Sequence, residues 1–188
     1  MTNAPRMSFP DFLAYSDSTN TAYELEHSQP IPAASALDRN QRMAIFLLAY
    51  FVQLGIPAPQ LRMKVEIVVL SGQLGVRVPD LVILSEELAH ELRGAKRSLV
   101  LPEMPTPLLV AELVSPYQAS RTYRYKRSEY AARGIPEYWI IDPMAERVTI
   151  LQWSEGYYEQ QIYRDDKTIN SPLLGKLTLT AAEILQAI

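Results

Sequence analysis

Apolar residues recur at helical spacing along the first third of the chain, and this pattern predicts two helices. The first is short and is expected at about 9–17. The second is expected at about 35–54, and because its second half is apolar almost all round, we expect it to be buried on most sides. Residues 23–26 fit either an extension of the first helix or a strand. Pro30 and Pro32 are expected to break the chain before the long helix.

The pattern then changes to short runs of Val, Ile, Leu and Tyr, which predict strands. Residues 61–70 and 76–84 are expected to form a hairpin whose connection begins at Ser71-Gly72. Residues 107–114 are expected to form a buried central strand, because the run is almost entirely apolar. Three further strands are expected at 138–141, 147–153 and 157–163.

Three helices are expected among and after these strands. Ser85 is expected to cap a helical piece over 86–92. A basic, tyrosine-bearing helix is expected over 121–133, with Gly134 as its C-terminal cap. Residues 180–183, Thr-Ala-Ala-Glu, have the sequence of a capping box that opens a short terminal helix. This succession of helices and strands predicts a mixed α/β domain.

The length and composition are typical of one soluble globular domain. The chain has 188 residues, of which 48% are hydrophobic and 21% are charged, and this excludes a largely disordered protein. The 18 basic and 21 acidic residues give a net charge of −3. Since this charge offers no overall attraction to nucleic acid or to an anionic membrane, any such contact must use a local patch.

The residue types that the chain lacks exclude several kinds of site. The absence of cysteine excludes disulfides, thiolate zinc sites, iron–sulfur clusters and cysteine nucleophiles. His27 and His90 are far apart in sequence and are expected at the surface, which argues against a zinc enzyme or a Ser-His-Asp hydrolase. Any bound metal is therefore expected to be a hard ion held by carboxylates.

We expect the protein to be cytoplasmic and to have no contact with a membrane. The first eleven residues do not have the pattern of a secretory signal. The longest apolar run, 43–52, is too short to cross a bilayer.

Three charged residues lie in or next to the apolar runs and are candidates for chemistry. Asp80 follows Pro79 at the end of an apolar run, Glu112 lies inside the predicted central strand, and Lys126 lies on the following helix. Taken singly, Asp80 can cap a turn, Glu112 can pair with a buried cation, and Lys126 can be a solvated helix lysine. Together, two carboxylates on neighbouring strands make an oxygen-lined site for Mg²⁺ or Mn²⁺, and a nearby lysine suits metal-assisted hydrolysis of a phosphodiester.

The direction of side chains along the strand narrows the choice of lysine. Residues two apart on a strand face the same way, so Glu112 and Val114 share a face and Leu113 points to the other. A lysine at position 114 would lie beside Glu112, but the chain has valine there. Lys126 is the nearest candidate, and on a helix it shares a face with Tyr130.

Four segments around these residues resemble the Uma-two (Uma2) family. This is a family of bacterial endonucleases in the PD-(D/E)XK superfamily, which includes restriction enzymes. The resemblance runs from about residue 23 to the terminal helix. The segments are Pro79-Asp80, Ala-Glu-Leu-Val-Ser-Pro over 111–116, Lys-Arg-Ser-Glu-Tyr over 126–130, and Gly-Ile-Pro-Glu-Tyr-Trp-Ile-Ile-Asp-Pro over 134–143.

The resemblance implies a restriction-endonuclease-like core, with a mixed central β-sheet flanked by helices. It implies a single domain over 1–188 with an N-terminal helical part at about 8–55. It also implies that Asp80 and Glu112 are metal ligands, that Glu24 completes the metal site, and that the lysine has moved to the helix, as Val114 and Lys126 suggest here. Many nucleases of this type act as dimers, so a homodimer is expected.

The chain departs from the family pattern at three places. Thr122 stands where the family often has aspartate four residues before the helix lysine. His27-Ser28-Gln29 stands where the family usually has a glycine, and Asn40 stands where a histidine is common near the start of the long helix.

The leading hypothesis is a Mg²⁺- or Mn²⁺-dependent endonuclease that hydrolyses phosphodiester bonds in DNA. Asp80, Glu112 and Lys126 would carry the chemistry, and the basic helix would contact the nucleic-acid backbone through Arg121, Arg124 and Arg127. The alternative is a catalytically inactive nuclease-fold protein that acts as a nucleic-acid-binding or interaction module. A third hypothesis is a structural dimer partner that uses the Tyr- and Trp-rich C-terminal strands as an interface.

Overall fold

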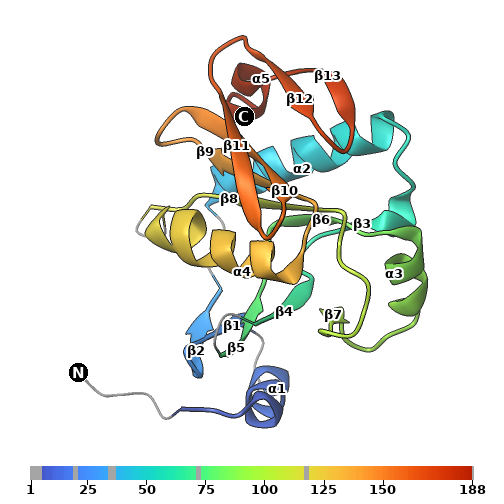
Figure 1. Cartoon of the computed structure of the whole chain (residues 1–188), viewed down its shortest axis with the longest axis vertical. Helices are drawn as coiled ribbons and strands as arrows, with labels where there is room; N and C mark the ends of the chain where they lie inside the picture. The colour runs from blue at the N-terminus through green and yellow to red at the C-terminus, as the bar shows by residue number, and fades with distance from the viewer. Residues whose placement is uncertain (1–5, 19–20, 34–36, 71–72, 117–118, 188) are drawn as a thin grey trace.

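Helices and two larger sheets alternate through the molecule as layers (Figure 1). The computed structural model describes residues 6–18, 21–33, 37–70, 73–116 and 119–187. The α-helices are α1 (Phe9–Asp17), α2 (Asp38–Gln53), α3 (Glu86–Glu91), α4 (Arg127–Arg133) and α5 (Ala181–Leu185). A 3₁₀ turn, η1 (Ala58–Gln60), and a π-helical segment, η2 (Arg121–Lys126), complete the helical elements of the described residues.

The strands of the described residues form three sheets. The six-stranded sheet has the order β11 (Tyr157–Tyr163), β10 (Arg147–Ser154), β9 (Glu137–Asp142), β8 (Leu109–Leu113), β6 (Leu81–Ile83) and β3 (Leu61–Arg62). The five-stranded sheet has the order β2 (Gln29–Pro32), β1 (Tyr23–Glu26), β5 (Leu74–Arg77), β4 (Glu66–Leu70) and β7 (Leu99–Val100). The strands β12 (Thr168–Ser171) and β13 (Gly175–Thr180) pair separately. Because β8 runs parallel to β9 and antiparallel to β6, the large sheet is mixed, as expected.

Alternation along β8 explains how the layers pack. Its odd-numbered residues, such as Ala111, pack on α2 and α5 in one core cluster. Its even-numbered residues, such as Val110, face α4 in a second cluster that also contains Ile67 of β4. Helix α4 therefore lies between the two large sheets, and α1 covers the far face of the five-stranded sheet through Phe12 (Figure 1). Glu112 belongs to the even-numbered side, so its side chain points at α4 and not at α2.

The predicted central hairpin forms, but it is divided between the two large sheets. Strands β4 and β5 pair in one sheet and β3 and β6 in the other, with the same register on both sides of the interruption. The interruption on the second strand is Val78–Asp80, where Pro79 has no N–H to donate to a ladder. Asp80 consequently lies where the hairpin passes from one sheet to the other. The predicted connection at Ser71-Gly72 lies outside the described residues.

Most of the predicted helix boundaries are confirmed by capping contacts. The Ser85 side chain accepts a hydrogen bond from the Leu88 N–H at the start of α3. Gly134 ends α4 with φ +73°, a left-handed conformation that glycine adopts without steric cost. Both hydrogen bonds of the capping box form: the Thr180 side chain accepts one from the Glu183 N–H, and the Glu183 side chain accepts one from the Thr180 N–H.

Two expectations for the N-terminal part are wrong. Pro30 and Pro32 do not break the chain: they lie in β2, which is an edge strand, so their missing N–H groups are not needed for pairing. The part expected to be helical over 8–55 thus also contains the β1–β2 hairpin. Helix α2 begins at Asp38 and is not buried on most sides, because Ile45 and Val52 are 59% and 47% exposed. Residues 34–36 lie outside the described residues.

Other differences concern short strands that the sequence analysis did not predict or left open. The hairpin β12–β13 and the two-residue strand β7 were not expected from the sequence. Residues 23–26, for which the sequence left two readings open, form strand β1. In the part of the chain that the structure describes, there is no helix long and apolar enough to span a membrane.

Candidate active site

Glu112 is buried in the middle of strand β8, where its neighbours on the strand are apolar. It is 4% exposed, and its Oε1 accepts hydrogen bonds from Lys126 Nζ and from the Tyr130 hydroxyl, each at 2.8 Å. Lys126 and Tyr130 are four residues apart and therefore lie on one side of their helix. The basic helix thus supplies both donors that stabilise this buried carboxylate.

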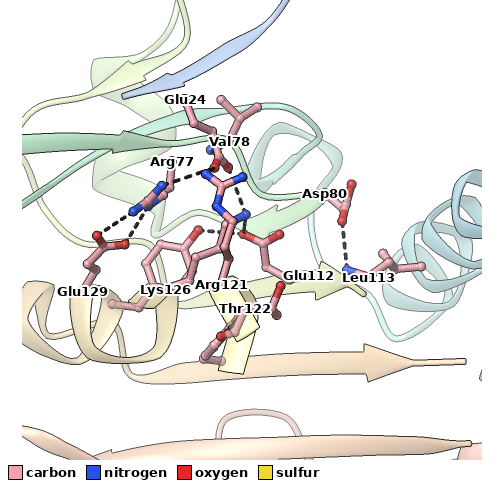
Figure 2. Close-up of polar contacts among 12 residues, drawn as sticks. Glu24, Arg77, Val78, Asp80, Glu112, Leu113, Arg121, Thr122, Lys126 and Glu129 are labelled. Atoms are coloured by element: carbon pink, nitrogen blue, oxygen red, sulfur yellow. Dashed lines mark hydrogen bonds and ion pairs between the residues drawn. The ribbon is translucent and has the colours of Figure 1, made fainter. Parts of the chain in front are cut away.

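Lys126 lies between two carboxylates from different sheets (Figure 2). Its Nζ is 2.8 Å from Glu112 Oε1 and 2.9 Å from Glu24 Oε1, and its side chain is almost completely buried. Glu24, on β1, also accepts a hydrogen bond from the Val78 N–H at 3.1 Å. This bond fastens β1 to the interrupted hairpin two residues before Asp80.

One ammonium group shared by two carboxylates leaves Glu112 short of positive charge. Burial raises the pKa of Glu112 to about 7; Lys126 opposes this rise, and the nearby Asp80 and Glu24 charges add to it. Burial would also raise the pKa of Glu24, but Lys126 and Arg77 outweigh it and hold that pKa below its ordinary value. Burial alone would lower the pKa of Lys126, and the two carboxylates raise it, so the lysine is charged.

Arg77 organises the other side of Glu24. It is 1% exposed and donates two hydrogen bonds to Glu129 of α4, at 2.6 and 2.7 Å. It also contacts Glu24 Oε2 at 3.3 Å and Glu26 Oε2 at 2.8 Å, and Figure 2 shows it between Glu24 and Glu129. Arg121 of η2 contacts the same two carboxylates of β1, at 3.0 and 2.7 Å. These contacts hold β1, β5 and the basic helix together.

The close approach of β5 to β1 depends on Gly75. A Cβ atom at this position would lie 2.9 Å from the Leu25 carbonyl oxygen and 3.3 Å from Val69 Cγ2. Glycine therefore allows β5 to lie against the strand that carries Glu24.

Asp80 lies at the interruption of the hairpin, next to the carboxyl end of β8 (Figure 2). Its Oδ2 accepts a hydrogen bond from the Leu113 N–H at 2.8 Å, directly after Glu112 in the chain. Its Oδ1 is 3.0 Å from Nζ of Lys64, whose side chain is 43% exposed. Asp80 is thus fixed beside Glu112 and paired with a cation at the surface.

A small cavity joins these groups. It has a volume of about 20 Å³, which is room for about one water molecule or one ion. Asn40 of α2 lines it, 2% exposed, and its Nδ2 contacts the Leu113 and Val114 carbonyl oxygens at 3.3 and 3.4 Å. Its Oδ1 is buried and has no hydrogen-bond partner among the residues that the structure describes. The charged residues that line the cavity are Glu24, Lys64, Asp80, Glu112 and Lys126.

The carboxylates of this cluster face cations rather than one another. Within the described ranges, no group of three His, Cys, Asp or Glu side chains has the arrangement of a ready metal-binding cluster. The reason is visible in the contacts, since Lys126 separates Glu24 from Glu112 and Lys64 pairs with Asp80.

The predicted arginines of the basic helix do not lie on one surface. Arg121 turns inward to Glu24 and Glu26, and Arg127 donates to Gln160 Oε1 and to the Tyr158 carbonyl oxygen on β11. Arg124 is the exposed one of the three.

Sequence reasoning brought together Glu24, Asp80, Glu112 and Lys126, and it missed three neighbours. Arg77 could have been recognised in the sequence, because a charged residue between Val76 and Val78 is as unusual in an apolar strand as Glu112 is. Asn40 was noted only as a departure from a family pattern. Lys64 had no signal in the sequence, since only the folded hairpin places it beside Asp80.

Comparison with known proteins found a matching family and a similar structure. The model of the Uma2 family, described as "Putative restriction endonuclease", matches residues 9–182. A crystal structure of a putative nuclease belonging to DUF820 from Anabaena variabilis is similar, with a TM-score of 0.76 and 17% sequence identity, over 96% of this chain and 98% of that chain. No curated protein matches the chain. The structural similarity shows that the two chains share a fold.

Proposed function

The chain belongs to the Uma2 family, and on that premise we propose that it hydrolyses phosphodiester bonds in DNA with a bound Mg²⁺ or Mn²⁺ ion. The observation that carries the proposal is the shared cavity of Asp80, Glu112 and Lys126. Glu112, inside β8, and Asp80, directly before the neighbouring β6, line a space that fits about one ion, and the buried Lys126 lies against Glu112.

The balance of charge around the cavity supports a cation there. Among the described residues, the ion pairs in and next to the cavity involve five carboxylates and four lysine or arginine side chains: Glu24, Glu26, Asp80, Glu112 and Glu129 against Lys64, Arg77, Arg121 and Lys126. Buried carboxylates without a full complement of positive charge are costly. A divalent cation beside Asp80 and Glu112 would supply it.

The donors available around the cavity suit a hard cation. Asp80 and Glu112 would hold the ion, and Glu24 would provide a third carboxylate. The Oδ1 of Asn40, which has no hydrogen-bond partner within the described ranges, is a neutral oxygen donor of the kind that Mg²⁺ accepts. Such an ion polarises the scissile phosphate and lowers the pKa of a water molecule.

The side chains around the ion have separate tasks in this proposal. Lys126 keeps Glu112 oriented through its 2.8 Å contact and places positive charge beside the attacking water or the developing phosphorane. Arg124, being exposed, contacts the nucleic-acid backbone, whereas Arg121 and Arg127 position the helix that carries it. A homodimer stays a prediction that sedimentation can test.

An inactive nucleic-acid-binding module is the alternative function. Thr122, which is 5% exposed and lines the cavity, favours it, because the family often has a carboxylate at this position. This alternative predicts salt-sensitive binding of DNA without cleavage in any divalent metal.

The test is a plasmid-cleavage assay with Mg²⁺ or Mn²⁺ on the wild type, Glu112→Gln and Asp80→Asn. We expect metal-dependent cleavage by the wild type and a loss of about 100-fold or more in each variant. Glutamine keeps the oxygen that accepts from Lys126 and Tyr130, so the fold is preserved. Glu91→Gln, at an exposed position on α3, is the matched control.

Cleavage at the wild-type rate by both site variants contradicts the assignment of the site. Binding without cleavage by the wild type in every metal supports the inactive module instead.

A further inference from the structure

Lys64 occupies an unusual backbone position at the mouth of the site. It lies between β3 and β4, where the hairpin passes from one sheet to the other, and its φ is +58°. This left-handed conformation is uncommon for a residue other than glycine, asparagine or aspartate, and such positions cluster at functional sites. Here it directs the ammonium group to Asp80 Oδ1, 3.0 Å away.

The two lysines of the site differ in their access to a substrate. Lys126 is almost completely buried and contacts two carboxylates, so it can leave neither without exposing an unpaired buried charge. Lys64 has a side chain that is 43% exposed, and its ion pair is to Asp80. An ion pair of this exposure is weak and readily exchanged for another.

Lys64 also borders a second, larger space. A groove of about 190 Å³ lies outside the inner cavity and is lined by Asn40, Gln41, Ala44, Ile45, Met63, Lys64 and Asp80. Three of these residues, Asn40, Lys64 and Asp80, also line the inner cavity, so the groove adjoins it. A polyanion that approaches Asp80 through this groove passes the ammonium group of Lys64.

We propose that Lys64 is a phosphate-binding residue for the nucleic-acid substrate and that its ion pair with Asp80 is the arrangement without metal. The inference rests on the proposed function. When a divalent cation takes over the charge of Asp80, the ammonium group of Lys64 loses its partner at the groove. It then binds a backbone phosphate as a mobile point charge. Metal binding and nucleic-acid binding are therefore coupled through Lys64.

The test measures the binding of a short DNA duplex by fluorescence anisotropy, with EDTA and with Ca²⁺, an ion that takes the same oxygen ligands. The proteins are the wild type, Lys64→Met, Lys64→Arg and the control Lys96→Met, at an exposed lysine outside the site. Without metal, we expect Lys64→Met to bind DNA as the wild type does. With Ca²⁺, we expect it to bind about 5- to 10-fold more weakly and to lower the salt slope by about one.

Two further readouts complete the experiment. In a titration without DNA, Lys64→Met should bind Mn²⁺ as tightly as the wild type or several-fold more tightly, because the variant lacks the ammonium group that competes with the metal ion for Asp80. Lys64→Arg, which keeps the charge, should retain most of the metal-dependent DNA affinity.

If the wild type and Lys64→Met bind DNA equally well in Ca²⁺, this inference is wrong and the proposed function is unaffected. The same holds if Lys64→Met loses as much DNA affinity with EDTA as it does with Ca²⁺. A wild type that binds neither Mn²⁺ nor DNA overturns the proposed function and this inference with it.

Discussion

At the scale of single residues, Arg77 is a buried cation that pairs with three carboxylates. It contacts Glu24, Glu26 and Glu129, which come from one strand and one helix. Its contacts with Glu129 have the two-point geometry that suits arginine and not lysine.

Arg77→Met should destabilise the fold by about 3–5 kcal/mol, because it removes the cation that pairs with the buried Glu129 and one of the cations that pair with Glu24 and Glu26. Urea unfolding followed by circular dichroism measures this change. Arg93→Met is the control, since Arg93 is exposed, and it should change the unfolding free energy by no more than about 0.5 kcal/mol. Equal unfolding midpoints for the two variants would show that the buried network is not a source of stability.

The residues of the site were predictable to different degrees for a physical reason. Glu112 was visible in the sequence because a charge inside an apolar strand needs a partner. Lys126 was indicated by its place on the next helix, and the structure puts it within 2.8 Å of Glu112. Lys64 and Asn40 lie far from both in sequence, and only tertiary packing brings them to the cavity.

At the scale of elements, two hairpins of the molecule have two-residue turns of the same geometry and different sequence. His27 and Ser28 connect β1 to β2 with φ values of +50° and +63°, and Glu155 and Gly156 connect β10 to β11 with +49° and +96°. Positive φ at both turn positions favours Asn-Gly or Asp-Gly. A residue with a side chain, such as Ser28, adopts this conformation at a cost in conformational free energy.

Exchanging the turn residues tests this directly. Ser28→Gly should stabilise the protein by about 0.5–1 kcal/mol, and Gly156→Ser should destabilise it by a similar amount. Thermal and urea unfolding of the two variants measure the changes. If both variants shift stability in the same direction, backbone conformation is not what limits these turns.

Two of the errors in the predicted elements have a common origin. A run of residues predicts a strand, but not the sheet to which the strand belongs. The run 76–84 predicts one strand, and Pro79 divides it between two sheets. Pro30 and Pro32 predict a break in the chain, because an edge strand, which tolerates proline, cannot be recognised without its sheet.

At the scale of the whole molecule, the site lies where the two large sheets meet. Glu24 comes from the five-stranded sheet, Glu112 from the six-stranded sheet, and Asp80 from the hairpin that joins them. Lys126, on the helix between the sheets, contacts both glutamates. The mixed α/β class was predictable from the order of elements, but the second large sheet was not, because its strands are short and two of its pairings, β1 with β5 and β4 with β7, join distant segments.

The central claim is that Asp80 and Glu112 hold a divalent cation, and Mn²⁺ titration calorimetry on the wild type and Glu112→Gln tests it most directly. We expect one ion to bind the wild type and binding to be lost, or weakened by about 100-fold or more, in the variant. The same titration with a DNA duplex present covers the case in which a substrate phosphate completes the metal shell. Equal Mn²⁺ affinity of the two proteins in both titrations would contradict the assignment of Glu112 as a metal ligand.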